Sequence, residues 1–467
     1  MTRRFEALII GAGPAGLSAA VELANSGIKA AVVDENPDVG GQVYRQPPSA
    51  FTISDEKHPY ATHQFGHSLI KSFKSLSEKI TTIHESYIWG LFDNESLAIF
   101  NKGEIELVQF DKLILCEGAL ERSIPFPGWT LPGIMTAGGL QKLVKSQRLL
   151  PGKRFLLAGC SPLLLSVAGS LVSAGAEFVG MCDATTFMEN LRLVPEILSR
   201  RNMWQETICL QSQLLRRAAK VYRPYSIVSA DGDSRVRTAT IARLDKKWMP
   251  IPGSETQIAI DIVGLGFGFL PNARLARLCG CSHAYDSGQK CWKPKTDQYM
   301  RSSKQNIYVA GDSSGIGGAD NAGVEGRIAG IHAAFELGKI SQTELSSRMD
   351  ALLNEKQRNG RYALLLNQIF APRDGLYNIL DGDTVICRCE GVAAKEIMAG
   401  IELGARNINM VKRTTRSGMG LCQGRTCESI ITQLMLQRNI PIEDVAYLNL
   451  RPPLSPMPLD TFITSPV

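Results

Sequence analysis

The sequence predicts an α/β protein of several domains that ends in a small cysteine-bearing module. Three observations predict this class: a glycine-rich turn joins an apolar strand at residues 5–10 to a helical stretch, a second strand, turn and helix begin at residue 154, and four cysteines stand in two short clusters after residue 386. Short apolar strands that alternate with helical patterns are typical of parallel sheets covered by helices. At 467 residues with 43 glycines, the chain is too long for one core and implies about two to four domains.

The composition excludes several classes of function. The net charge of +6 is small for this length and no basic stripe with interleaved aromatic residues is present, so nucleic-acid binding is not expected. The eleven cysteines are odd in number and scattered, which favours a reducing cytoplasm over a disulfide scaffold. No run approaches the roughly 18 apolar residues that span a bilayer, so no transmembrane segment is expected, while peripheral association with the inner membrane stays open. Arg3 and Arg4 precede a run that continues into the glycine turn, so we interpret it as a strand rather than an export signal.

The first glycine turn predicts a dinucleotide-binding βαβ unit, with a helix at 17–26 and a second strand at 28–33. Gly11 permits the tight turn, Gly13 lets the backbone approach a pyrophosphate, and Gly16 allows the helix and strand to pack closely. The phosphates would lie at the helix N-terminus, where free N–H groups and the helix dipole favour negative charge. The predicted binding segment is Gly11-Ala12-Gly13-Pro14-Ala15-Gly16.

An acidic residue stands where the ribose of such a ligand is expected. Asp34 ends the second strand, 23 residues after Gly11, and is placed to accept hydrogen bonds from the ribose hydroxyls. Glu35 follows it, and two interpretations of Glu35 stay open: it shares this role or it is a solvated neighbour. Strand, glycines, helix and acid in register are more specific than a lone G-x-G-x-x-G.

The segment N-I-Y-V-A-G-D at 306–312 indicates which dinucleotide is bound. It places Gly311 and Asp312 after a strand and before a helix expected from about Ala322. An aspartate in this position binds the ribityl chain of FAD in flavoproteins, and an ordinary helix N-cap is the alternative. With these features the chain resembles the Rossmann-like flavoproteins with two dinucleotide-binding domains, and Gly40-Gly41-Gln42 matches that family's third phosphate-side contact. The resemblance implies FAD as a cofactor.

The second strand–turn–helix unit, A-G-C-S-P-L-L-L at 158–165, departs from the fingerprint. Gly159 occupies the first glycine position. Ser161 stands at the second, where it crowds the approach of a pyrophosphate, and Leu164 stands at the third, where it is expected to push the helix away from the strand. NAD(P) is therefore not expected here; the pocket either holds another nucleotide, such as ATP or ADP, or is empty and structural. Cys279 and Cys281 form only a C-x-C and are expected to be buried as small apolar residues, so thiol–disulfide chemistry is disfavoured.

The four C-terminal cysteines predict a soft metal centre, either zinc or an iron–sulfur cluster. Thirty-two residues separate C-R-C from C-Q-G-R-T-C, a spacing that does not match the C-x-x-C knuckles of zinc ribbons. It resembles the small [2Fe–2S] domain of bacterioferritin-associated ferredoxin, with zinc or free thiols as alternatives. Nearby arginines would offset the charge of a cluster, or form a solvated face or a docking surface. The expected ligands are Cys387, Cys389, Cys422 and Cys427, and the arginines are Arg388, Arg413, Arg416 and Arg425.

Longer segments support a narrower resemblance. The stretches C-E-G-A-L-E-R-S-I-P-F-P-G-W-T-L-P-G-I-M-T-A-G-G (116–139) and A-G-D-S-S-G-I-G-G-A-D (310–320), together with the cysteines, resemble the α subunits of hetero-oligomeric bacterial amino-acid and opine dehydrogenases across nearly the whole chain. That group includes the large subunit of octopine and nopaline oxidases, the B-type subunit of hydrogen cyanide synthase, and the α subunits of L-proline and D-hydroxyproline dehydrogenases.

The resemblance implies an electron-transfer subunit. In this group a β subunit flavoprotein, similar to glycine and sarcosine oxidases, oxidises the C–N bond of an amino acid, imino acid or opine, and a small γ subunit is a further expected partner. The chain itself shows no recognisable catalytic set, because its six histidines form no constellation and Glu117 and Glu121 are interpreted as polar turn residues. The rival hypothesis is a self-contained NAD(P)H:acceptor oxidoreductase with an iron–sulfur outlet, and a non-enzymatic redox scaffold is the third.

The expected domain organisation has five parts. The tail at 451–459 is too proline-rich for a helix or a central strand and is interpreted as an extended arm against the body or a partner. The expected parts are an FAD-binding domain (1–150), a degenerate nucleotide-binding domain (151–257), an FAD-binding return segment (258–335), a helical linker (336–380), and a [2Fe–2S] domain with the C-terminal arm (381–467).

Overall fold

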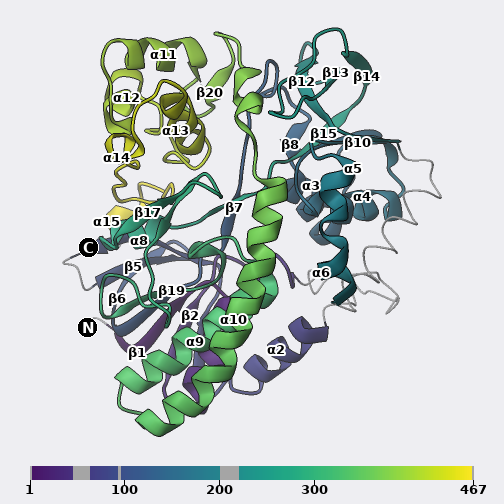
Figure 1. Ribbon diagram of the computed structural model, residues 1–467. Coiled ribbons are helices and arrows are strands. Elements are labelled where there is room, and N and C mark those ends of the chain that lie inside the picture. Colours follow the sequence, from purple (N-terminus) through teal and green to yellow (C-terminus); the bar gives the residue numbers. More distant parts are fainter. Residues whose placement is uncertain (1–2, 46–63, 93–95, 200–219, 465–467) are drawn as a thin grey trace.

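Two main sheets, one mixed and one parallel, and a small helical module make up most of the protein in the computed structural model, which describes residues 3–45, 64–92, 96–199 and 220–464 (Figure 1). The first sheet and the long helices α9 (Ala319–Glu336) and α10 (Gln342–Phe370) form the lower part of the view. The second sheet lies at the upper right with α3 (Ala137–Ser146) and α4 (Leu163–Ser173), and the C-terminal module, in yellow-green, lies at the upper left.

The first sheet has the strand order β3-β2-β1-β6-β5-β4, and β19 pairs with β6. β4 and β5 extend it in the antiparallel sense, whereas the other neighbours are parallel. The register places Ile9 between Val32 and Ile114, and all three side chains are fully buried, as expected for a sheet covered on both faces. Its strands are β1 (Arg3–Ile10), β2 (Ala30–Val33), β3 (Ile80–Ile83), β4 (Ser86–Phe92), β5 (Ser96–Asn101), β6 (Glu104–Leu115) and β19 (Ile307–Val309).

Helix α9 packs backbone to backbone on α1 (Pro14–Asn25), because it carries glycine where the two helices meet. A Cβ at Gly326 would lie 2.0 Å from the Ala15 carbonyl oxygen, and one at Gly330 would lie 2.7 Å from that of Ala19. This close approach brings the return segment that precedes α9 onto the first turn of α1. The helix α2 (Gln64–Lys74) packs on α1 as well.

The second sheet has the order β11-β10-β9-β15-β8, with all neighbours parallel. A separate antiparallel sheet has the order β12-β13-β14. The short helices α5 (Phe187–Leu191) and α6 (Val194–Ser199) follow β10. The strands are β8 (Ile134–Thr136), β9 (Arg154–Gly159), β10 (Glu177–Asp183), β11 (Lys220–Tyr222), β12 (Tyr225–Asp231), β13 (Thr238–Arg243), β14 (Thr256–Ala259) and β15 (Ile262–Gly266).

Residues 258–266, at the start of the expected return segment, belong to two strands in different sheets. β14 ends at Ala259 and β15 starts at Ile262. Between them the Asp261 carboxylate accepts hydrogen bonds at 3.0 Å from the backbone N–H groups of Lys153 and Arg154, so the break fixes the start of β9. The expected domain limits at 150/151 and 257/258 also differ from the sheet pairing, because β8 and β15 lie outside 151–257 yet both belong to the second sheet. We infer that the second nucleotide unit includes both strands.

The antiparallel pair β7 (Ala119–Glu121) and β16 (Phe269–Pro271) lies in the two chain segments that link the sheets. β16 continues into the short helix α8 (Arg274–Leu278) and the hairpin β17 (His283–Asp286) and β18 (Cys291–Pro294). Helix α8 and this hairpin lie against the C-terminal module in Figure 1.

The module has its own hydrophobic core. Its elements are β20 (Val385–Cys387), β21 (Val392–Ala393), α11 (Ala394–Glu402), α12 (Ile408–Thr415), α13 (Cys427–Gln437) and α14 (Ile442–Val445). The tail, expected as an extended arm against the body or a partner, contacts β4 of the first sheet: the Leu454 N–H donates to the Trp89 carbonyl (2.8 Å) and the Tyr87 hydroxyl donates to the Pro456 carbonyl (3.0 Å). The short helix α15 (Thr461–Thr464) follows.

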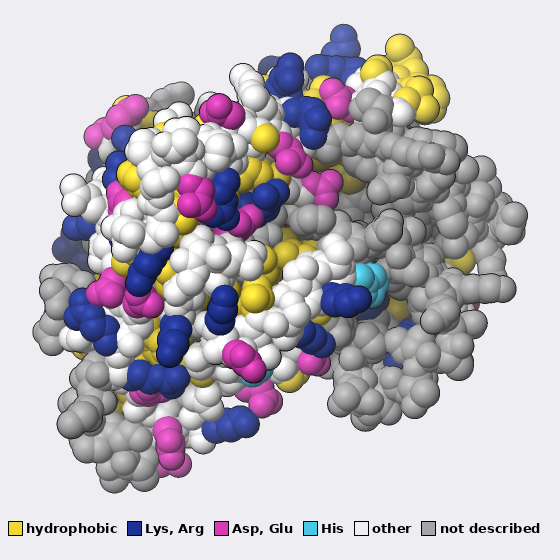
Figure 2. Space-filling model, turned by 90° about the horizontal axis from the view of Figure 1, so that it is seen from below, with side chains coloured by type: hydrophobic (Ala, Val, Ile, Leu, Met, Phe, Trp, Pro, Cys, Tyr) yellow, Lys and Arg dark blue, Asp and Glu magenta, His cyan; other side chains and the backbone are white. Residues whose placement is uncertain are grey.

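The surface carries mixed charge. In Figure 2, Lys and Arg side chains alternate with Asp and Glu across the coloured part of this face, with no large patch of one sign. Among the described residues, no helix combines the length and apolarity needed to cross a membrane.

Candidate functional site

The first glycine turn is built for close approach at Gly11 and Gly16. Gly11 has φ +103°, and a Cβ there would lie 2.2 Å from the Cys116 carbonyl oxygen. A Cβ at Gly16 would lie 1.8 Å from the Gly11 carbonyl oxygen. Gly13 is different, since a Cβ there meets only the Gly41 Cα, at 3.9 Å. The space beside Gly13 is the cradle that a pyrophosphate needs, and the turn therefore fits the predicted ligand.

The start of α1 leaves donors for an anion. Pro14 occupies the first helical position and has no N–H, and the bond from Leu17 N–H to the Gly13 carbonyl (2.9 Å) is the first within the helix. The N–H groups of Ala15 and Gly16 precede that bond, so they belong to the helix end at which negative charge is stabilised.

The structure separates the roles of Asp34 and Glu35. Asp34 is buried: its Oδ2 accepts the Ala12 N–H at 2.6 Å, and its Oδ1 accepts the backbone and side-chain N–H groups of Asn36, both at 2.8 Å. Glu35 is exposed. Asp34 thus locks the glycine turn while its remaining lone pairs stay available to a ribose, and Glu35 fits the solvated interpretation.

The predicted third contact lies against the first. Gly41 has φ +62°, and a Cβ there would lie 2.8 Å from the Gly13 Cα. The exposed Gln42 accepts a hydrogen bond from Arg45 (2.9 Å), which also donates to Asn36 (3.0 Å). Sequence reasoning missed Arg45 and Asn36, because nothing in their spacing marks them as neighbours of the turn.

The return segment meets the glycine turn at Gly311, whose Cβ position lies 2.9 Å from the Ala15 Cβ. Asp312 follows, and its Oδ1 accepts the N–H groups of Gly317 and Gly318, both at 3.0 Å. Burial raises the pKa of Asp312, and the two backbone N–H bonds oppose that shift. Among the described contacts Oδ2 has no partner, so one carboxylate oxygen is left to accept a ribityl hydroxyl.

Glu325 supports this turn and was not predicted. Its buried Oε2 accepts the Gly311 N–H (2.9 Å) and the Ser314 hydroxyl (3.0 Å), and its Oε1 accepts the Asn321 amide (3.0 Å). Burial raises the pKa of Glu325, with Lys356 and these donors opposing it. The signal in the sequence is one acid inside the G-V-E-G-R-I-A-G stretch, where small residues already indicate a buried helix face.

At the second glycine turn, N–H groups at the start of α4 are already bonded. The Ser161 hydroxyl accepts the Leu163 N–H (3.3 Å) and the Ser161 carbonyl accepts the Leu164 N–H (3.0 Å), so the first turn of α4 satisfies its own N–H groups. The acid at the end of β10, Asp183, is held by Thr185 (3.0 and 2.7 Å) and by Arg223 (2.8 Å). Asp34 of the first turn also accepts three hydrogen bonds, so the features that distinguish the second turn are the Arg223 ion pair and the Ser161 bonds.

Leu164 does not push α4 away, contrary to expectation. It is buried against Gly266 of β15, where a Cβ would lie 2.7 Å from the Leu164 Cδ2. Because Gly266 has no side chain, β15 leaves room for Leu164, so α4 does not need a glycine at this position. Cys279 and Cys281 are buried, as predicted, and burial raises the pKa of both thiols.

The four C-terminal cysteines form two thiol pairs. Cys387 ends β20 and Cys427 opens α13, and these buried thiols are hydrogen-bonded to each other. Cys389, which is exposed, and Cys422, which is half-buried, form the other hydrogen-bonded pair. Gly420 allows the two segments to meet, since a Cβ there would lie 2.3 Å from the Cys389 Cβ. Helix α11 begins at Ala394, directly after β21.

The donors around Cys387 favour a thiolate, the form that binds metal. The bond with Cys427 and the backbone N–H groups of Gly418, Glu390 and Cys389 lower the pKa of Cys387 to about 6, against the effect of burial. Within the described ranges no three His, Cys, Asp or Glu side chains converge as ligands of one metal ion. Two pairs fit a binuclear cluster, in which each iron takes two thiolates, better than a single zinc ion.

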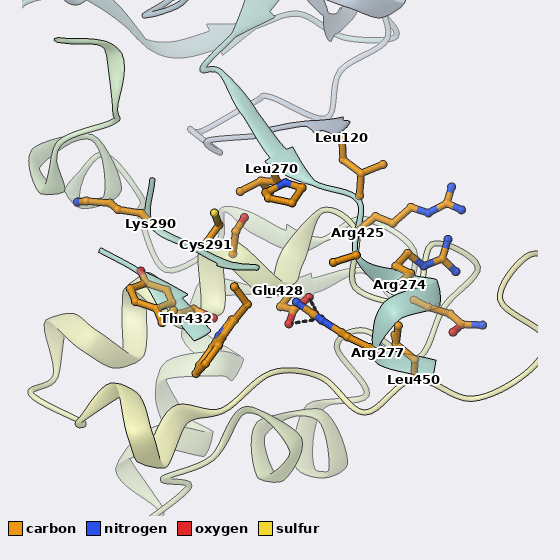
Figure 3. Close-up of a pocket in the computed structure, with 16 residues that line it drawn as sticks. Leu120, Leu270, Arg274, Arg277, Lys290, Cys291, Arg425, Glu428, Thr432 and Leu450 are labelled. Atoms are coloured by element: carbon orange, nitrogen blue, oxygen red, sulfur yellow. Dashed lines mark hydrogen bonds and ion pairs between the residues drawn. The ribbon is translucent and has the colours of Figure 1, made fainter. Parts of the chain in front are cut away.

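A basic cavity of about 50 Å³ separates the module from the flavoprotein body (Figure 3). Arg277 of α8 spans this boundary, and its guanidinium donates two hydrogen bonds to Glu428 of α13, at 2.7 and 2.8 Å, drawn as dashed lines. Lys290 pairs with Asp374 at the other end. Arg274 and Arg425 also line the cavity, so cationic side chains from both parts of the chain meet here.

Charged groups connect the first glycine turn to the cysteines. Glu117, next to Cys116, accepts the Leu275 N–H (3.3 Å), and burial raises its pKa to about 7 although Arg274 and Arg425 oppose this. Arg274 is 8% exposed and donates to the Leu454 carbonyl. Burial and the nearby charge of Arg425 lower the pKa of Arg274 to about 10, against the opposing effect of Glu117 and Cys422. Glu117 and Cys422 therefore both act on the charge of Arg274.

Other contacts near the cysteines also join the module to the body. The Trp129 indole donates to the Val385 carbonyl (2.7 Å), and the Arg388 guanidinium lies over its ring at 5.2 Å. Glu121 ends strand β7 rather than lying in the expected turn, and its carboxylate accepts the N–H groups of Gly138 and Gly139 (2.8 and 3.2 Å) at the start of α3.

Comparison with known proteins agrees with this geometry. Residues 5–338 match the family model described as pyridine nucleotide-disulphide oxidoreductase. The chain belongs to this family. Residues 385–437 match the BFD-like [2Fe-2S] binding domain. The two matches imply FAD and a [2Fe–2S] cluster as cofactors, and they confirm the predicted fold class.

Relatives match over the whole length. The chain is 34% identical to the A-type subunit of opine oxidase from Rhizobium meliloti, over 97% of this chain and 86% of that protein. It is 31% identical to the HcnB subunit of hydrogen cyanide synthase from Pseudomonas aeruginosa, over 97% of both. These confirm the predicted resemblance. L-proline dehydrogenase from P. horikoshii shares the fold, with a TM-score of 0.66 at 19% identity over 99% of this chain and 80% of that one.

Proposed function

We propose that this chain is the FAD- and [2Fe–2S]-bearing electron-transfer subunit of a hetero-oligomeric enzyme that oxidises a C–N bond on a partner flavoprotein subunit. One observation carries the proposal: a dinucleotide cradle and a four-cysteine module lie in one chain, and the ion pair between Arg277 of α8 and Glu428 of α13 joins the two parts. The names of the relatives support the class of reaction, since opine oxidase and hydrogen cyanide synthase subunits align over nearly the whole chain.

Each part of the chain has a distinct role. Gly13 and the N–H groups that begin α1 would hold the FAD pyrophosphate, Asp34 the ribose, and Asp312 the ribityl chain, while Glu325 fixes the turn that carries Asp312. When bound, FAD accepts electrons in pairs and the cluster passes them on singly. Arg274 and Arg425 bring positive charge beside Cys422, which favours the extra negative charge of a reduced site.

The contacts of the second nucleotide unit disfavour the NAD(P)H-dependent alternative. A pyridine dinucleotide would have to displace the Ser161 bonds at the start of α4 and the Arg223 ion pair of Asp183. We therefore propose that this pocket is structural. No nucleophile or general base of this chain is assigned, and we propose that the β subunit performs the oxidation, with a small γ subunit completing the complex.

Anaerobic mixing experiments test the proposal. The purified chain is mixed with NADH and, separately, with its co-expressed flavoprotein partner and a panel of proline, hydroxyproline, sarcosine and opines. We expect the flavin absorbance of this chain to bleach only with the partner and one of these amines. Rapid bleaching by NADH alone would instead establish a self-contained reductase. The neutral control, Leu403→Ser at an exposed position of the module, should behave like the unmodified chain.

A further inference from the structure

The two thiol pairs differ in their exposure to solvent. Cys387 and Cys427 are 1% and 0% exposed and belong to the core of the module. Cys389 is exposed and Cys422 is half-buried. A cluster held by both pairs would therefore have an inner side and an outer side, and the outer side, at Cys389 and Cys422, is the side that another protein can approach.

Large apolar side chains flank the outer pair. Met419 is 43% exposed and Leu421 is 74% exposed, and both adjoin Gly420, which lies against Cys389. An exposed leucine alone needs no explanation. Two large apolar side chains next to an accessible thiol pair are more informative, because a close approach that excludes water suits electron transfer between proteins.

Positive charge surrounds this site. Arg388, Arg416 and Arg425 are exposed next to the cysteine segments. Arg416 pairs with Glu390 at 3.0 Å, whereas no carboxylate of the described residues lies within ion-pair distance of Arg388 or Arg425. The nearby carboxylates of Glu390 and Glu428 are both already bonded to arginines. The surface is thus apolar at its centre and basic at its edge.

We infer that this outer-pair surface, made of Met419, Leu421, Cys389 and Cys422 with Arg388, Arg416 and Arg425 around them, is the docking site for an acidic electron-accepting protein. The inference rests on the proposed function and adds the partner that receives the electrons. In the transfer step one electron leaves the reduced site of this chain, which is oxidised, and the acceptor's oxidised centre takes up that electron and is reduced. No bond forms or breaks.

The size of the surface favours a transient acceptor over a permanent subunit. A lasting subunit interface buries a large, continuous apolar area, whereas weak electron-transfer encounters use small areas. Here two apolar side chains stand inside a charged edge, and opposite charge on the partner would steer the encounter. The basic edge therefore points to an acidic partner.

The test uses the full-length protein and two c-type cytochromes of opposite net charge, one acidic and one basic. Stopped-flow mixing measures how fast each cytochrome reoxidises the photoreduced chain at rising salt. A zinc-substituted acidic cytochrome, which accepts no electron, measures binding alone through its fluorescence. Leu421→Asp is compared with Leu403→Asp, because Leu403 is 86% exposed on the same module and the two variants add the same charge.

We expect the acidic cytochrome to react faster than the basic one at low salt and to slow as salt increases. Leu421→Asp should lower both its rate and its binding by about tenfold, and Leu403→Asp by less than about twofold. Equal effects of the two variants, or equal rates with the two cytochromes, would overturn the inference. Dissociation of the co-expressed flavoprotein partner by Leu421→Asp would also overturn it, since the surface would then be a permanent interface within the complex. A chain without cluster absorbance would instead refute the proposed function.

Discussion

The ion pair between Arg277 and Glu428 is expected to hold the cysteine module on the flavoprotein body. Arg277 belongs to α8 and Glu428 to α13, and their side chains are 10% and 17% exposed. One Arg277 nitrogen, Nη1, donates to both oxygens of the Glu428 carboxylate, at 2.7 and 2.8 Å. Glu428 also accepts the Leu448 N–H at 3.1 Å, so the same carboxylate fixes the start of the C-terminal arm.

The geometry sets the magnitude of the interaction. Two unit charges about 4 Å apart attract by about 4 kcal/mol at an effective dielectric constant of about 20. Burial of both ions offsets part of this, so we expect a coupling free energy of about 2 kcal/mol between the two side chains. Glu428→Gln alone leaves a buried guanidinium without its counter-ion and should destabilise the module by about 3 kcal/mol.

A double-mutant cycle measures the coupling. Arg277→Met, Glu428→Gln and the double variant are unfolded in urea, with visible cluster absorbance reporting on the module and flavin fluorescence reporting on the body. The control cycle uses Arg4 and Asp111, an exposed pair at 2.6 Å whose side chains are 61% and 36% exposed, and whose coupling should stay below about 1 kcal/mol. Additive effects at Arg277 and Glu428, or equal coupling in both cycles, would refute the reasoning.

Three further predictions concern the two cofactor sites. Gly16→Ala should prevent folding of the FAD-binding part, because its Cβ would lie 1.8 Å from the Gly11 carbonyl oxygen. Gly13→Ala should fold, as circular dichroism would show, but should bind FAD at least about tenfold more weakly in a fluorescence titration. Cys422→Ser should remove the visible cluster absorbance and the EPR signal of the reduced state while FAD stays bound, and retention of both signals would exclude Cys422 as a ligand. Glu117 has a pKa raised to about 7, so its contribution to stability is complete below its unfolded value near 4.5 and is lost as pH rises through 7. The free energy of unfolding of Glu117→Gln, measured in urea relative to that of the unmodified chain, should therefore rise by about 1–3 kcal/mol between pH 5 and pH 8. A difference that stays constant with pH would show that Glu117 does not titrate in this range.

Features set by neighbouring residues in the sequence were predictable. The first glycine turn, Asp34 and the return segment ending in Asp312 each depend on a few adjacent residues, so spacing alone places them. The cysteine spacing likewise predicted the type of module. The structure brings Gly13 and Gly41 together and seats Gly311 on Ala15, as expected if they serve one ligand.

Features that depend on contacts between distant segments were not predictable. Leu164 fits because Gly266, about a hundred residues later, lacks a side chain, and no local pattern shows this. The split of 258–266 arises because β15 pairs with β8 and β9 while β14 pairs with β13. Glu325 could be noticed as an acid among small residues, yet its acceptor role at Gly311 follows only from the packing of α9 on α1.

The contacts that dock the module on the body also fix the position of the cysteine segments. Trp129 donates to the Val385 carbonyl, two residues before Cys387, and Glu428, which Arg277 binds, directly follows Cys427. The cysteine segments are thus held by the body through residues adjacent to the ligands themselves. A substitution that loosens these contacts should change the separation of the two cofactors before it changes either binding site. Electron transfer from flavin to cluster would then slow while FAD affinity and cluster absorbance stay the same, a pattern that neither an FAD-site nor a cysteine-ligand defect would produce.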